Sequence, residues 1–139
     1  MTRRVLPGVL ALLVLGALGW AALAPLGTGP RQAVYEIPPG TSARRLAGEH
    51  VDVFPQTIHL TLGLRDVLVL KNLDSGPHIF GPALILPGQS LRLPFSQAST
   101  YSFECSAHPA GGLNVIVQEG PAIGWERIRW RWQRLTHPA

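Results

Sequence analysis

The chain has 139 residues, of which 46% are apolar and 14% are charged, whereas about a quarter of the residues of an average soluble domain are charged. An apolar N-terminal segment and a basic C-terminal tail flank residues 31–120, which are enough for one small domain and too few for a multidomain enzyme. Residues 31–120 hold six basic and seven acidic side chains, so the net charge of +4 lies at the two ends. A nucleic-acid-binding domain usually carries its basic patch on the folded body, so we expect no nucleic-acid partner.

Residues 5–26 form an uncharged, apolar segment that follows Arg3 and Arg4. About 20 apolar residues in a helix span the roughly 30 Å hydrocarbon core of a bilayer. We therefore predict a single-pass transmembrane anchor, with residues 1–30 as cytoplasmic stub, anchor and short linker. The alternative is a signal peptide that is cleaved after Ala21 or Ala24. In either case the positive flank predicts that the remaining chain lies on the extracytoplasmic side, periplasmic or extracellular, of the cell membrane.

Residues 31–120 have the pattern of a small, antiparallel all-β domain, in which short strands are separated by turn residues. Alternating apolar and polar residues, or an uninterrupted apolar run, predict strands over 33–37, 57–62, 66–71, 91–95, 101–105 and 113–118. Residues 42–50 are compatible with a turn of helix. The alternation directs Cys105 into the core at the end of one strand and Leu113 into the core at the start of the next.

Cys105 is the only cysteine, so no disulfide within the chain is possible. A lone thiol in an oxidising compartment is protected when it is buried or bound to a metal. His108 follows Cys105 by three residues in a glycine-containing loop, and His78 follows a turn after the predicted central strand. A thiolate with two imidazoles suits copper, and a trigonal set of this kind is the blue-copper arrangement. The alternative is a small buried cysteine with two ordinary loop histidines.

Residues 54–117 resemble a cupredoxin of the plastocyanin/amicyanin kind. The resemblance rests on the turn over 72–78, on the aromatic run over 101–104, and on the Cys-x-x-His-Pro sequence that begins at Cys105. It implies a Greek-key β-sandwich that binds one type 1 copper and passes single electrons. By the same resemblance, His78, Cys105 and His108 are the equatorial metal ligands.

The sequence departs from this family at the axial position. Plastocyanins place a methionine five residues after the second histidine, where this chain has Leu113, and amicyanin spacing would place it at Gly111. Leucine cannot donate to copper, but an inward-pointing Leu113 would cover the axial site with hydrocarbon. A missing axial donor in a dry site disfavours Cu(II) relative to Cu(I), so we expect a high reduction potential.

Other site chemistries fit the sequence less well. Structural zinc takes four ligands, and His50, His59 and His137 are not placed to complete such a set. A dinuclear copper site of the CuA type needs two cysteines. A cysteine–histidine nucleophile would lack an orienting Asn or Asp, and the domain is too small for a substrate cleft. We therefore predict that the protein is not an enzyme and has no small-molecule substrate.

Residues 121–139 form a basic tail in which Trp125, Ile128, Trp132 and Leu135 share one helical face. Arg127, Arg131 and Arg134 occupy the other side, which is typical of an interfacial helix that lies on anionic headgroups. The alternatives are a helix packed on the sandwich and a disordered end.

These features predict a membrane-anchored, extracytoplasmic cupredoxin that carries single electrons between redox partners such as a cytochrome or an oxidase. The exposed edge of His108, framed by Pro109, Ala110 and Gly111, is the predicted electron port. Two other functions stay open. One is a Cu(I)-binding protein that delivers copper to a respiratory oxidase, and the other is a metal-free cupredoxin interaction module.

Overall fold

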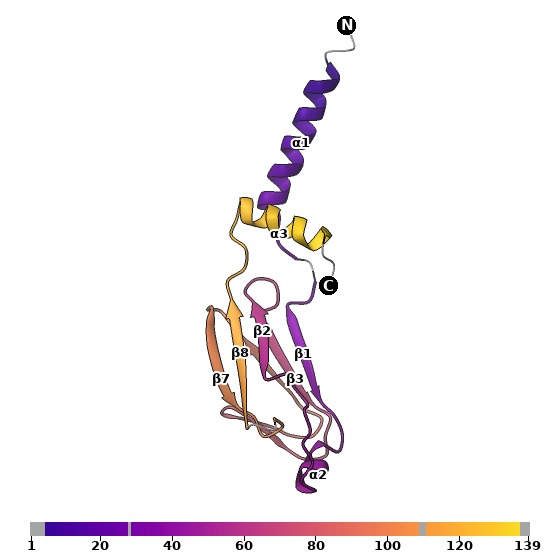
Figure 1. Cartoon of the computed structure of the whole chain (residues 1–139), viewed down its shortest axis with the longest axis vertical. Helices are drawn as coiled ribbons and strands as arrows, with labels where there is room; N and C mark the ends of the chain where they lie inside the picture. The colour runs from indigo at the N-terminus through magenta and orange to yellow at the C-terminus, as the bar shows by residue number, and fades with distance from the viewer. Residues whose placement is uncertain (1–4, 28, 109–110, 137–139) are drawn as a thin grey trace. The chain divides into compact units, whose positions relative to one another are not determined.

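The computed structural model describes residues 5–27, 29–108 and 111–136. The chain divides into two compact units, one formed by Met1–Thr28 together with Pro121–Ala139 and the other by Gly29–Gly120. The first unit contains helices α1 (Val5–Leu23) and α3 (Trp125–Thr136). The second contains the strands β1 to β8 and the short helix α2 (Thr41–Leu46) (Figure 1).

The second unit is a β-sandwich built from two three-stranded sheets and a hairpin. The first sheet has the order β1 (Gln32–Ile37), β3 (Val67–Asn72), β6 (Ser90–Pro94). The second has the order β2 (Thr57–Thr61), β8 (Gly112–Gln118), β7 (Ser99–Glu104). The hairpin consists of β4 (His78–Phe80) and β5 (Ala83–Ile85).

Two of the strand pairs are parallel, so the prediction of a purely antiparallel domain is wrong there. β1 pairs with β3, and β2 with β8, in parallel register, whereas β3–β6, β4–β5 and β7–β8 are antiparallel. Parallel neighbours need a crossover of a dozen or more residues. The chain supplies one between β1 and β3, which contains α2 and β2, and a longer one between β2 and β8.

The six predicted strands are confirmed to within two residues at each end as β1, β2, β3, β6, β7 and β8. The β4–β5 hairpin was not predicted, because strands of three residues are too short to show an alternation. Its two-residue turn depends on Gly81, which has a φ of 54°. A Cβ atom there would lie 3.0 Å from the ring of Phe103, so this turn requires glycine for conformation and for space.

The core lies between the two sheets and buries the inward-facing side chains of both. All four residues from Val67 to Leu70 are buried, as expected for a central strand. Cys105 and Leu113 are 2% and 1% exposed and belong to the core cluster. The inward orientation predicted for these two residues from the alternation is therefore confirmed.

The first unit differs from the sequence-based prediction at α1. The helix ends at Leu23 although the apolar run continues to residue 26, because proline at position 25 disfavours the helical conformation of Ala24 and cannot donate a backbone hydrogen bond. Within the described part of the chain, none of the helices combines the length and the apolar character needed to cross a membrane. The predicted transmembrane anchor is therefore not supported.

The tail forms the helix that its periodicity predicts. α3 covers Trp125–Thr136 and contacts α1 within the first unit. The sequence did not predict this contact between the two ends of the chain.

An ion pair between Arg31 and Asp66 joins the residues that directly precede β1 and β3 in the first sheet. The Asp66 carboxylate, whose side chain is 3% exposed, accepts hydrogen bonds from the Arg31 guanidinium and from the backbone N–H of Gly63. The hydrogen bond from Arg31 is the largest effect on this carboxyl and, together with Gly63, outweighs burial, so the pKa of Asp66 lies below its ordinary value.

We expect Asp66→Asn to reduce the acid sensitivity of the β-sandwich. A carboxyl group whose pKa is lower in the folded than in the unfolded chain stabilises the fold above the unfolded pKa of about 3.9 and loses this contribution as pH falls. The variant should therefore unfold at a lower denaturant concentration than the parent at pH 7, and the difference should shrink below about pH 4. Denaturant unfolding at several pH values measures this, and a difference that is constant with pH would contradict the expectation.

Candidate metal centre

The three predicted metal ligands are buried. Backbone hydrogen bonds bring the segments that carry them together at one end of the sandwich. His78 is the first residue of β4, Cys105 directly follows β7, and His108 lies in the connection to β8; their exposures are 3%, 2% and 2%. Phe80 and Cys105 form an isolated β-bridge, and the Ser106 N–H donates to the Ile79 carbonyl over 3.0 Å. These bonds join the start of β4 to the segment that follows β7.

Cys105 and His108 belong to one tight loop. The His108 N–H donates to the Cys105 carbonyl, and the Cys105 N–H donates to the Gly111 carbonyl across the loop, over 3.2 and 3.0 Å. Gly111 has a φ of 72°, which favours glycine. Pro109 and Ala110, which were predicted to frame an electron port, lie outside the described residues. The exposed edge predicted for His108 is wrong, because this residue is 2% exposed.

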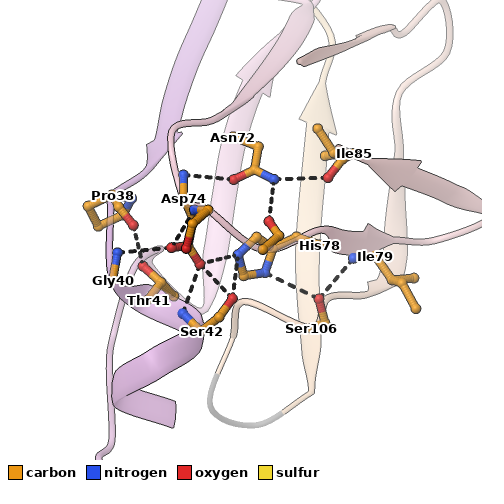
Figure 2. Close-up of polar contacts among 12 residues, drawn as sticks. Pro38, Gly40, Thr41, Ser42, Asn72, Asp74, His78, Ile79, Ile85 and Ser106 are labelled. Carbon is orange, nitrogen blue, oxygen red and sulfur yellow. Dashed lines mark hydrogen bonds and ion pairs between the residues drawn. The ribbon is translucent and has the colours of Figure 1, made fainter. Parts of the chain in front are cut away.

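A buried carboxylate holds the imidazole of His78. Asp74 Oδ2 lies 2.9 Å from His78 Nε2, and neither side chain is more than 4% exposed (Figure 2). The Asp74 oxygens also accept hydrogen bonds from four groups near the N-terminus of α2 and in the β3–β4 turn: the N–H groups of Gly40, Ser42 and Ser75 and the Ser42 hydroxyl. This carboxylate therefore ties α2 and the β3–β4 turn to the imidazole.

The electrostatics keep Asp74 ionised. Burial by itself would raise the pKa of the Asp74 carboxyl, but the hydrogen bonds from Ser42, from His78 and from the Ser75 N–H together outweigh it and hold this pKa far below its ordinary value. An ionised carboxylate has no hydrogen to give, so Nε2 of His78 must carry the hydrogen in this contact. In the neutral ring the lone pair is then on Nδ1, the atom that a metal would use.

Nδ1, the second ring nitrogen of His78, has only a long contact with a possible hydrogen-bond partner. Nδ1 lies 3.5 Å from the Ser106 hydroxyl oxygen, at the long limit of a hydrogen bond. That oxygen also accepts a hydrogen bond from the Ile79 N–H over 2.8 Å, so it lies between the backbone of Ile79 and the imidazole of His78 (Figure 2). His78 and Ser106 also line a surface pocket of about 300 Å³. The lone pair on Nδ1 is therefore not committed to a strong partner.

The environment of Cys105 has opposing effects on its thiol. Burial is the largest effect and raises the pKa of Cys105, whereas the backbone N–H groups of Ala107 and His108 and the charge of Arg45 lower it. The net pKa is raised, so the side chain is a thiol at neutral pH. The two N–H groups are positioned to stabilise sulfur once it is deprotonated, which metal binding requires.

The donor types fit copper, but the side chains do not form a complete metal site. One thiol, two imidazoles and a buried Leu113 make a soft, nitrogen-rich and dry set. Across the described ranges, no three or more His, Cys, Asp or Glu side chains form a group that could hold a metal ion. The roles of His78, Cys105 and His108 as ligands, and of Leu113 at the axial position, therefore stay predictions.

Sequence reasoning missed Asp74 and Ser106, and the expectation that no Asn or Asp orients a histidine is wrong, because Asp74 contacts His78. A signal existed for Asp74, because it lies in a turn, four residues before a suspected ligand histidine. No sequence signal identified Ser106, because its contact with His78 depends on the pairing of β4 with the segment after β7.

Comparison with known proteins identifies cupredoxins among the solved structures. A purple cupredoxin from Nitrosopumilus maritimus is 20% identical over 61% of this chain and 98% of its own, with a TM-score of 0.45. The oxidised state of an amicyanin mutant is 20% identical over 68% and 90% of the two chains, and a Cu(I) amicyanin mutant gives the same values, both with a TM-score of 0.44. No protein-family profile and no curated protein matches the chain. Because these TM-scores lie below 0.5, the chemistry of the site has to be derived from this chain's own residues.

Proposed function

We propose that the β-sandwich unit is a cupredoxin-like type 1 copper protein that carries single electrons. The observation that supports this proposal is the buried contact of Asp74 with the imidazole of His78, in a segment that backbone hydrogen bonds join to the one that carries Cys105 and His108. A carboxylate that fixes the tautomer and the orientation of a histidine is the usual support of a metal-binding imidazole. A buried, hydrogen-bonded carboxylate would be a costly way to position a histidine without a function.

In this proposal Asp74 orients one ligand, His78, before copper binds. Asp74 keeps the hydrogen of His78 on Nε2, and Nδ1 faces the site. Cys105 loses its thiol proton on binding, and the N–H groups of Ala107 and His108 stabilise the sulfur. Bound copper supplies a centre that gains and loses one electron. The buried Leu113 cannot donate to a metal, which would favour Cu(I) and a high reduction potential when copper is bound.

The test is to load the full chain with Cu(II) and to record visible absorption and electron paramagnetic resonance. We expect an intense thiolate-to-copper band and narrow hyperfine splitting. His108→Ala should remove both signals, whereas His59→Ala should retain them, because His59 is an exposed residue of β2. A protein that binds neither Cu(II) nor Cu(I) would overturn the proposal and favour a metal-free interaction module.

One observation favours copper delivery as a second candidate function. Leu113 is buried and cannot coordinate, so the remaining donors form a soft set of low coordination number that suits Cu(I). Uptake of Cu(I) alone, followed by its transfer to an acceptor, would establish this second function. Rapid redox cycling without loss of copper would establish the electron carrier. The redox partner, a cytochrome or an oxidase, and the extracytoplasmic location stay predictions from the sequence.

A further inference from the structure

The first unit presents an apolar surface that nothing in its described part covers. From Val9 to Leu23, α1 contains no charged residue, and nine of its large apolar side chains are 45–71% exposed. They lie all around the helix and not on a single stripe. A helix of this kind needs an apolar environment over most of its circumference.

Two arginines of α3 donate hydrogen bonds to backbone carbonyls at the C-terminal end of α1. Arg127 Nη1 donates to the carbonyls of Leu23 and Ala24, over 3.2 and 3.1 Å. Arg131 Nη2 donates to the carbonyls of Ala24 and Pro25, over 2.9 and 3.1 Å, and its guanidinium lies 5.3 Å from the ring centroid of Trp20. Cations at a helix C-terminus offset the partial negative charge of the free carbonyls. The two ends of the chain therefore form one structural element.

Apart from the half-buried Ile128 and Trp130, the rest of α3 is exposed and has both properties of a bilayer interface. Trp125, Trp132 and Leu135 are 73%, 68% and 79% exposed. Arg129 and Arg134 are exposed as well, and the Arg134 guanidinium lies 4.9 Å from the ring centroid of Trp130. The helix contains four arginines and one glutamate, a net charge of +3. Tryptophan is enriched at the headgroup level of membranes, and arginine is attracted to anionic headgroups.

We propose that α1 and α3 together bind the surface of an anionic phospholipid bilayer. α3 lies in the headgroup layer with Trp125, Trp132 and Leu135 directed toward the acyl chains, and Arg129 and Arg134 contact the phosphates. Arg127 and Arg131 hold α3 at the end of α1, so that the apolar surface of α1 meets the same lipid phase. The positive charge commits the surface to an anionic lipid, and this distinguishes lipid from a second copy of the chain, which would bring like charges together.

The chain carries its own probe for this proposal, because its four tryptophans are at positions 20, 125, 130 and 132, all within the first unit. Detergent-purified full chain is diluted onto vesicles of phosphatidylcholine with or without phosphatidylglycerol. We expect a blue shift of tryptophan emission, quenching by brominated acyl chains, and tighter binding to the anionic vesicles that weakens with salt.

Replacing Arg129 and Arg134 together by glutamate should weaken binding to the anionic vesicles by about tenfold or more. The matched control replaces Arg65 and Arg92, exposed residues of the β-sandwich unit, by glutamate and should leave binding unchanged. Equal affinity for both kinds of vesicle, no difference between the two double variants, or emission that shifts only on self-association without lipid would each overturn the proposal. None of these readouts involves copper, so they are independent of the proposed function of the β-sandwich.

Discussion

Cys105→Ser is expected to abolish the intense visible band of the copper-loaded chain and to widen its hyperfine splitting. Both properties of a type 1 centre come from the covalent bond between copper and the thiolate sulfur, and a serine oxygen is a harder donor that does not form such a bond. Because Cys105 is the only cysteine, no other thiol in the chain can substitute for it. The measurement is the visible and electron paramagnetic resonance spectrum of parent and variant at equal copper occupancy.

A failed fold must be distinguished from a lost bond. Cys105 is 2% exposed, so a serine hydroxyl there is buried in an apolar setting. Cys105→Ala avoids that polar group and should lose the band as well, while both variants keep the circular dichroism of the parent. Ser102→Ala, at an exposed position of β7, the strand that Cys105 follows, should retain the full spectrum. A band that persists in Cys105→Ala would contradict the assignment of the sulfur ligand.

Asp74→Ala is expected to destabilise the metal-free chain by about 3 kcal/mol or more, because an unsatisfied buried donor costs about 1–3 kcal/mol and several lose their acceptor. The substitution removes the common acceptor of five hydrogen bonds, and buried donors left without an acceptor are costly. Denaturant unfolding measures the loss. Asp52→Ala, at an exposed position, should change the unfolding free energy by less than about 0.5 kcal/mol.

Asp74→Asn separates positioning of the imidazole from stability. The amide has one acceptor oxygen and no charge. With that oxygen in the place of Oδ2 it still faces Ser42 and His78, while the Gly40 and Ser75 N–H groups lose their acceptor. The contact that orients the imidazole is therefore kept but loses its charge. Loss of such a supporting carboxylate costs about 10–100-fold in metal affinity. Competition titration of Cu(I) against a chelator measures the affinity. An unchanged affinity in a variant that is clearly less stable would restrict Asp74 to a structural role.

The predictions for Cys105 and Asp74 concern different parts of the candidate site. They differ in how much of each residue's role can be predicted from the sequence. Cys105 and its inward orientation can be read from the alternation over 101–105, because strand periodicity is local. Asp74 accepts from α2, which precedes it by more than thirty residues, and from His78, which follows it by four. No local pattern indicates that α2 reaches this turn.

The same distinction explains the errors in the predicted fold. The parallel pairing of β1 with β3 and of β2 with β8 joins segments separated by long connections, and sequence patterns specify a strand's buried face but not its neighbour. The contact of α3 with α1 joins the two ends of the chain through arginine side chains and backbone carbonyls. Every residue has a backbone carbonyl, so the sequence does not indicate which carbonyls accept these hydrogen bonds.

The sequence by itself determined the six longer strands, the inward orientation of Cys105 and Leu113, and which donor types are available, because periodicity and side-chain chemistry are local properties. Only the tertiary structure decided that His108 is buried, that Asp74 orients His78, and that Ser106 faces its second nitrogen. Each of these depends on the distance between atoms that are remote along the chain or on how a loop packs. Such distances are set by the packing of the two sheets and of α2, and no single segment encodes them.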